Sequence, residues 1–127
     1  MPMNPSEEKY DLVIVKDLVK YFPIRAGVLQ RVKAHVQAVD KVSFSVKEGE
    51  TLGMVGESGC GKTTVGRAIL RLIEPTSGSV FINGEDIVQM RSQSLKQARR
   101  NMQMIFQDPY ASLNPRLPIG ESVMEGL

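Results

Sequence analysis

Residues 56–63, GESGCGKT, fit the phosphate-binding pattern G-x-x-x-x-G-K-[ST] at every fixed position. The apolar run TLGMV at 51–55 precedes this octapeptide and predicts a short buried strand, and residues 64–73 have the apolar spacing of a helix. A strand that enters a glycine-rich turn and opens a helix directs backbone N–H groups and the positive helix end to one point. The sequence therefore predicts a site for nucleotide phosphates at this turn.

The residue types of the loop suit that chemistry. Gly56 and Gly61 permit positive φ and a close approach of the backbone to phosphate oxygens. Lys62 supplies a compact charge for the β- and γ-phosphates, and the Thr63 hydroxyl is a ligand for Mg²⁺. Cys60, the only cysteine, is either a redox-sensitive thiol beside the nucleotide or, in the interpretation we favour, a small apolar filler that shapes the loop.

Composition narrows the class of protein. The 127 residues carry a net charge of +2, with 42% hydrophobic residues, as in one soluble globular domain. The weak, mixed charge argues against a nucleic-acid partner. No run of about 18 apolar residues occurs, so we expect no membrane span. One cysteine cannot form an internal disulfide, which suits a reducing cytosol. A helical pattern that begins near residue 120 and stops at 127 without a cap indicates a fragment.

Ahead of the loop, the pattern is that of strands. An apolar run at 12–15 is followed by apolar–polar alternation at 32–38 and 42–46. These runs predict an antiparallel β layer with one wet face over about 11–50. His35 falls on the polar phase without a His or Cys neighbour, so we expect it at the surface rather than on a metal.

Behind the loop, the sequence alternates between helix and strand. The helix at 64–73 is expected to end before Pro75, with Arg67 and Arg71 on a solvated face. Residues 79–82 and the Asn83-Gly84 turn predict a hairpin. A polar helix is expected at 92–100, with Arg99-Arg100 solvated, and a strand at 101–106 with Met102, Met104 and Phe106 on one side.

The next segment, QDPYASLNPR at 107–116, resembles the Q-loop of ABC transporter ATPases, in the Q-D-P-Y-x-S-L-N-P-R form of the dipeptide and oligopeptide importer branch. The strand and G-E turn at 42–50 and the P-T-S-G hairpin at 74–84 are similar to segments that flank the phosphate loop in that family. The resemblance runs from about residue 12 to the end. It implies an α/β fold, an incomplete P-loop NTPase core with an antiparallel β subdomain.

Within this family resemblance, the 127 residues are the N-terminal part of one ATPase domain. Its expected parts are a β layer at about 11–50, the phosphate loop and helix at 51–74, a hairpin, short helix and strand at 75–106, and the Q-loop with the start of a helical region at 107–127.

The resemblance also implies site residues. The adenine-stacking aromatic falls on Phe22, with Tyr21 able to substitute, because a ring face offers the base a flat apolar platform; alternatively, this aromatic pair fills the β layer. Gln107 would approach Mg²⁺ and the attacking water, so Gln107 and Lys62 are catalytic candidates, and Thr63 and Gln107 metal ligands. The phosphates would lie on Gly56, Glu57, Ser58, Gly59, Cys60, Gly61, Lys62, Thr63 and Thr64.

The function implied by the resemblance is ATP hydrolysis that powers import of di- or oligopeptides, at the cytoplasmic face of the membrane. ATP and Mg²⁺ would be the cofactors. The implied partners are a second ATPase subunit, membrane permeases and, indirectly, an extracytoplasmic substrate-binding protein, with no nucleic acid. The cargo stays open among dipeptides, oligopeptides, nickel and sugars.

Other motifs of the family do not occur in the sequence. These are the L-S-G-G-Q signature, an apolar strand that ends in Asp-Glu, and the switch His. We therefore expect the 127-residue chain to bind Mg-ATP weakly, to fold marginally and not to turn ATP over. Alternatives are a non-catalytic nucleotide-binding module, a soluble ABC ATPase of DNA repair or translation, and another P-loop enzyme such as a kinase.

Overall fold

The computed structural model describes residues 11–28 and 31–125. Its four-stranded sheet has the order β2-β1-β3-β4, and every neighbouring pair is antiparallel. The strands are β1 (Asp11–Ala26), β2 (Arg31–Lys47), β3 (Ser77–Ile82) and β4 (Glu85–Asp86). The helices are α1 (Lys62–Ile69), α2 (Ser92–Ala98), the 3₁₀ turn η2 (Arg99–Asn101), α3 (Pro109–Ser112) and α4 (Ile119–Met124).

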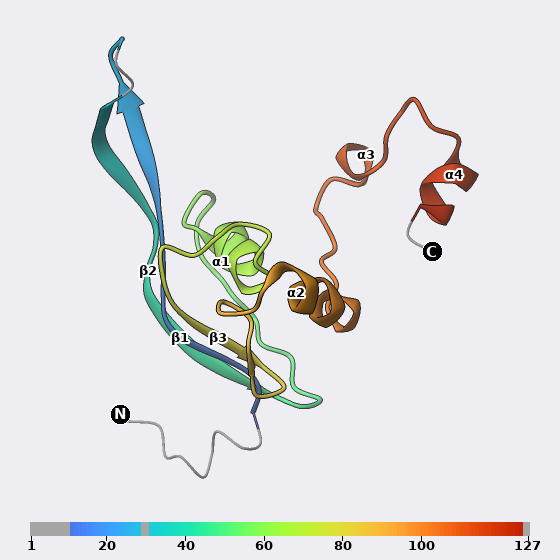
Figure 1. Ribbon diagram of the computed structural model, residues 1–127, viewed down its shortest axis with the longest axis horizontal. Coiled ribbons are helices and arrows are strands. Elements are labelled where there is room, and N and C mark those ends of the chain that lie inside the picture. The colour runs from blue at the N-terminus through green and yellow to red at the C-terminus, as the bar shows by residue number, and fades with distance from the viewer. Residues whose placement is uncertain (1–10, 29–30, 126–127) are drawn as a thin grey trace.

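The elements form a curved sheet with helices on one side (Figure 1). The long β1–β2 ribbon projects beyond the rest at the upper left, and α1 lies beside the sheet near the middle of that ribbon (Figure 1). After α2 the chain runs away from the sheet to α3 and α4 (Figure 1). None of the described helices is long and apolar enough to cross a membrane.

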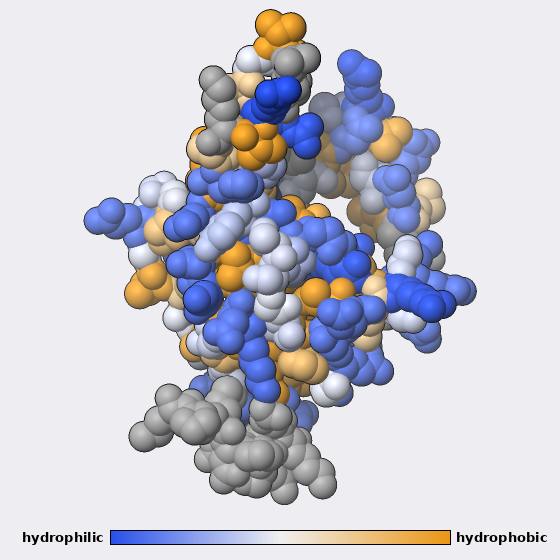
Figure 2. All heavy atoms as spheres, turned by 60° about the vertical axis from the view of Figure 1, so that its left-hand side comes forward, coloured by the Kyte–Doolittle hydropathy of each residue, from blue (hydrophilic) through white to orange (hydrophobic). Residues whose placement is uncertain are grey.

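The antiparallel β layer expected from the alternating pattern is present. The two alternating runs, 32–38 and 42–46, join in the single strand β2, which pairs with β1 from Asp11↔Lys47 to Ala26↔Arg31. Irregularities in the register, with positive φ at Asp17 and Lys41, bend and twist the ribbon. The face turned to the viewer in Figure 2 mixes hydrophilic and apolar side chains, as expected of a partly wetted sheet.

The hairpin predicted at Asn83-Gly84 is confirmed. Both residues have positive φ, 52° and 78°, as a two-residue turn between twisted antiparallel strands requires. Its first strand, β3, pairs with β1 through contacts such as Val15↔Val80, so the hairpin extends the β1–β2 sheet. Gly78 makes this approach possible, because a Cβ at that position would lie 2.5 Å from the Asp17 carbonyl oxygen.

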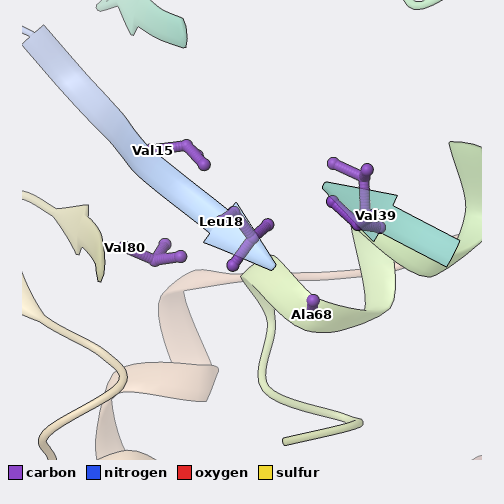
Figure 3. Packing of buried hydrophobic residues seen from close by; sticks show 6 residues of the cluster. Val15, Leu18, Val39, Ala68 and Val80 are labelled. Carbon is purple, nitrogen blue, oxygen red and sulfur yellow. The ribbon is translucent and has the colours of Figure 1, made fainter. Parts of the chain in front are cut away.

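One apolar cluster joins the sheet to α1. It consists of Val15, Leu18, Val39, Val65, Ala68 and Val80, all of them buried. In Figure 3, Leu18 and Val39 extend from neighbouring strands toward the helix that carries Ala68. An eight-residue helix is marginal by itself in water, so this packing is the main reason that α1 is stable here.

Two expected strands are absent. Residues 51–55 and 101–106 are not in strands, and no described strand pairs with either run. The burial expected for 51–55 is also wrong, since Val55 is 94% exposed. Apolar composition favours a strand, but a strand forms only beside a hydrogen-bonding neighbour, and the described residues provide none here.

The helix after the phosphate loop is shorter than expected at its far end. It begins at Lys62 and ends at Ile69, not at residue 73. Arg71 has a left-handed φ of 51°, and the Thr76 N–H donates to the Val19 carbonyl oxygen. The chain leaves the helix early because residues 74–78 turn back to join β1. The polar helix expected at 92–100 is confirmed as α2 followed by η2.

The core makes a testable prediction about stability. Leu18 is fully buried among the sheet and α1, so Leu18→Ala should lower the free energy of unfolding by about 2–5 kcal/mol. Ile24→Ala, on the same strand but 46% exposed, should cost about 0.5 kcal/mol. Urea unfolding followed by circular dichroism measures both, and equal losses would contradict the packing described above.

Candidate functional site

The phosphate loop is seated directly against strand β2. Gly61, the residue before α1, has a φ of 98°. A Cβ on Gly61 would collide with the carbonyl oxygen of Ala38. Glycine is therefore required at this position for both its positive φ and its lack of a side chain. This contact fixes where the loop lies relative to the sheet.

Lys62 folds back across the loop. Its Nζ donates to the carbonyl oxygens of Gly56 at 2.6 Å and Glu57 at 2.7 Å, and to Cys60 Sγ at 3.4 Å. The ammonium group thus lies within the curve of the loop. A phosphate bound there would compete with, or share, donors that now serve two backbone carbonyls.

The N-terminus of α1 is available to an anion. Within the described residues no side chain caps it, and its first turn contains no acidic residue. The intrahelical ladder starts with the Val65 N–H, which donates to the Gly61 carbonyl oxygen at 2.9 Å. The N–H groups that precede Val65 lie at the positive end of the helix dipole and are suited to bind phosphate oxygens.

The structure brings Gln107 to the phosphate loop. A pocket of about 540 Å³ is lined by loop and helix residues from Ser58 to Thr64, by Gln107 and by part of β2, namely Val36, Gln37 and Ala38. A neighbouring pocket of about 650 Å³ also has Thr63 and Gln107 in its wall, together with Arg67 and residues 104–108. Thr63 and Gln107 therefore lie where the two pockets meet.

The donor set fits Mg²⁺ held jointly with a nucleotide. The described residues contain no group of three or more His, Cys, Asp or Glu side chains that could hold a metal alone. The Thr63 hydroxyl and the Gln107 amide instead offer neutral oxygens in the wall of one pocket. Mg²⁺ commonly takes one or two protein ligands and completes its shell with water and phosphate oxygens.

The two aromatic candidates differ in their surroundings. The Phe22 ring is 40% exposed and pairs across the ribbon with Val36, which lines the pocket beside the phosphate loop. Tyr21 is half-buried, and its hydroxyl donates to Asp40 Oδ1 at 2.7 Å. Filling of the β layer therefore describes Tyr21 better than Phe22, whose ring stays open on the ribbon. Adenine stacking on Phe22 remains a prediction.

The structure also places three other side chains considered in the sequence analysis, those of His35, Cys60 and Glu57. His35 is exposed, as expected. Cys60 is exposed too, but its sulfur occupies the space where a Cβ on Gly56 would lie, at 2.6 Å. The position of the thiol beside Gly56 fits the favoured interpretation that Cys60 shapes the loop, and the alternative of a redox-sensitive thiol stays untested. Glu57 contributes its backbone carbonyl to Lys62.

The solvated positions expected for Arg71 and Arg99 are wrong. Arg71 donates to Glu74 and to the carbonyl oxygens of Ile87 and Met90, at 3.3 and 2.5 Å. Arg99 donates to the carbonyl oxygens of Leu70 and Arg71, at 3.3 and 2.6 Å. Both side chains satisfy carbonyls at the end of α1 and in the chain that follows β4, and thereby fix the orientation of the helix that carries the phosphate loop.

The sequence did not identify the contribution of β2 to the site. Val36, Gln37 and Ala38 line the pocket, but their alternating pattern is that of any strand. Only the seating of Gly61 on Ala38 reveals it. A glycine required at a helix N-terminus was the one available signal that another backbone lies close by.

Comparison with known proteins shows the family of this chain. The ABC transporter family pattern matches residues 39–125. The oligopeptide transport ATP-binding protein AppF of Bacillus subtilis is 54% identical over 112 residues, which cover 87% of this chain and 34% of AppF. The glutathione import ATP-binding protein GsiA of Pectobacterium atrosepticum is 55% identical over 113 residues, 89% of this chain and 18% of GsiA.

A solved structure is similar as well. It is the dimeric ATP-binding cassette MJ0796 in a post-hydrolysis state bound to ADP and Pi, with a TM-score of 0.59 and 30% sequence identity. The match covers 69% of this chain and 35% of that chain. The chain belongs to the ABC transporter family, and it spans about a third or less of the length of these relatives.

The Tyr21–Asp40 bond generates a pH prediction. The hydrogen bond to Asp40 raises the pKa of Tyr21, and burial and the negative charge of Asp40 add to the rise. The stabilisation from this bond is complete below the unfolded tyrosine pKa of about 10 and is lost as pH rises through the higher folded pKa. In Asp40→Ala the Tyr21 pKa should fall toward its ordinary value.

Ultraviolet absorbance of tyrosinate against pH measures this change. Because the chain has three tyrosines, Tyr21→Phe identifies which ionisation step belongs to Tyr21. An identical step in the wild type and in Asp40→Ala would contradict the assigned cause.

Proposed function

We propose that this chain is the ATP-binding part of an ABC-type ATPase that powers import of peptides. The observation that carries the proposal is the pocket in which the phosphate loop, the start of α1 and Gln107 meet. The two relatives described above are named for oligopeptide transport and for import of glutathione, itself a short peptide. Their names support peptides as the cargo class.

In this proposal the nucleotide lies along the loop and the ribbon. The N–H groups of 56–64 and the Lys62 ammonium bind the phosphates, and the neutral oxygens of Thr63 and Gln107 hold Mg²⁺. Phe22 supports adenine. Bound Mg²⁺ supplies charge that offsets the negative charge of the β- and γ-phosphates. Lys62 adds a positive charge within hydrogen-bonding reach of the loop backbone, and Gln107 orients water at the pocket wall.

The partners follow from the same proposal. A second ATPase subunit would face the nucleotide, which is supported by the dimeric form of the solved relative. Membrane permeases would couple hydrolysis to transport, and an extracytoplasmic binding protein would deliver the cargo. The chain would act at the cytoplasmic face of the membrane, as the N-terminal part of one ATPase domain whose sections are 11–50, 51–74, 75–106 and 107–127.

The phosphate site is tested first by removing its charge. Lys62→Ala should weaken ATP binding about tenfold or more, because a charge-assisted hydrogen bond to phosphate is lost. Lys96→Ala is the matched control, since Lys96 is exposed on α2 and does not line the pocket. Isothermal titration with Mg-ATP measures both. If Lys62→Ala binds ATP as tightly as the wild type, the proposed phosphate site is wrong.

Turnover is the second test. Hydrolysis requires an in-line water and stabilisation of the charge on the γ-phosphate. The 127 residues contain no L-S-G-G-Q motif and no apolar strand that ends in Asp-Glu. We therefore expect the purified chain to bind Mg-ATP without steady release of phosphate. A phosphate-release assay measures this, with Lys62→Ala as the background, and sustained release above that background would overturn the expectation.

A further inference from the structure

One lysine touches both the proposed base platform and the segment that leaves α1. Lys20 precedes Phe22 by two residues on β1. Its Nζ lies 5.0 Å from the centroid of the Phe22 ring, and the same Nζ donates to the carbonyl oxygen of Glu74 at 2.7 Å. The ammonium group therefore lies over the ring and is anchored to backbone at a second point.

We propose that Lys20 is a positioning residue for the base of the nucleotide, acting through Phe22. The inference rests on the proposed function, in particular on adenine stacking at Phe22. Lys20 holds the ring in one orientation from one side, so that the base stacks on the opposite face. A ring that is already oriented loses less side-chain freedom when the base binds.

The strength of the attraction between the Lys20 ammonium and the Phe22 ring depends on how exposed the pair is to water. A lysine ammonium over an aromatic face at this distance contributes modestly at exposed sites and more where water is excluded. Phe22 is 40% exposed, so the exposed case applies. The hydrogen bond to Glu74 favours one position of the flexible lysine side chain and keeps the charge over the ring.

The anchor at Glu74 is itself firmly placed. Two hydrogen bonds join the following segment to β1: the Thr76 N–H donates to the Val19 carbonyl oxygen at 2.8 Å, and the Tyr21 N–H donates to Thr76 Oγ1 at 3.0 Å. The close packing of Gly78 on Asp17 adds a third contact. Lys20 thus links the ring to the rigid junction between β1 and the helix that begins at the phosphate loop.

The sheet contains a matched control. Lys16, on the same strand, places its Nζ 5.7 Å from the centroid of the Phe81 ring. Phe81 pairs in the sheet with Ile14, which does not line the pocket beside the phosphate loop, whereas Phe22 pairs with Val36, which does. Lys16→Met therefore removes the same kind of contact from the same strand without altering the proposed base platform.

The experiment separates effects on the base from effects on the phosphates. The full chain is titrated with Mg-ATP and, separately, with Mg-tripolyphosphate, which has no base. Lys20→Met should weaken ATP binding about two- to fivefold and leave tripolyphosphate binding unchanged. Lys20→Arg keeps both the charge and the donor and should bind ATP like the wild type. Lys16→Met should change neither affinity.

Two results with Lys20→Met would contradict the inference. Equal weakening of ATP and tripolyphosphate in Lys20→Met would show a general structural role and overturn the inference, and so would unchanged ATP binding. If Lys20→Met does not fold by circular dichroism, Lys20→Gln replaces it, because glutamine keeps a donor for the Glu74 carbonyl oxygen without the cation.

Failure of the inference is distinguishable from failure of the proposed function. Lys62→Ala tests the phosphate site, and Phe22→Ala tests the base platform through the ratio of the two affinities. If Phe22→Ala changes that ratio and Lys20→Met does not, only the role of Lys20 is wrong. If Phe22→Ala leaves the ratio unchanged, the base platform is wrong and the inference falls with it.

Discussion

The seating of Gly61 on the carbonyl oxygen of Ala38 fixes the phosphate loop and the start of α1 against strand β2. It brings the turn before α1 against β2 at a point next to Val39, which is buried in the core with Val65 of the helix. The backbone contact between Gly61 and Ala38 and the burial of Val39 with Val65 therefore both join α1 to β2 at this point. Because protein interiors are tightly packed, a side chain at position 61 could not be accommodated by a small local shift. The direction of α1, and with it the direction of its N–H groups, follows from this contact.

The site assembled around this contact draws on residues that lie far apart in the sequence. The loop supplies the ammonium and the backbone donors, β2 supplies one wall, and Gln107 reaches the same pocket after the hairpin and α2. The Phe22 ring stands on the adjoining strand, opposite Val36 in the register. The proposed base platform and the proposed phosphate site thus lie on one sheet–helix unit.

The sequence identified the features that depend on local geometry. The octapeptide at 56–63, the Asn83-Gly84 turn and the polar helix at 92–98 each depend on φ preferences or spacing within a few residues. The sequence-based prediction was wrong where the structure of a residue depends on a neighbouring strand or a hydrogen-bond acceptor from elsewhere in the chain. The runs at 51–55 and 101–106 have strand composition, yet no described strand pairs with either. Arg71 and Arg99 have the composition of a solvated face, but Arg99 donates to open carbonyls at the end of the shortened helix, and Arg71 donates to Glu74 and to carbonyls in the chain after β4. Gln107 and Phe22 became candidates only through family resemblance, because nothing in the spacing of their neighbours points to a nucleotide, and their roles stay predictions.

The two ends of α1 differ in a way that explains how a short helix can hold an anion. At its C-terminal end Arg99 donates to the carbonyl oxygens of Leu70 and Arg71, which satisfies acceptors there and places positive charge at the negative end of the dipole. Its buried face is covered by the sheet. At the N-terminal end no side chain in the described residues caps the helix, and the first turn carries no acidic residue to offset the dipole. The charged side-chain partner thus lies at the end away from the phosphate loop, and the N–H groups at the start of α1 have no side-chain cap. An acidic cap there would stabilise the helix alone but would repel the phosphates that we propose the loop binds.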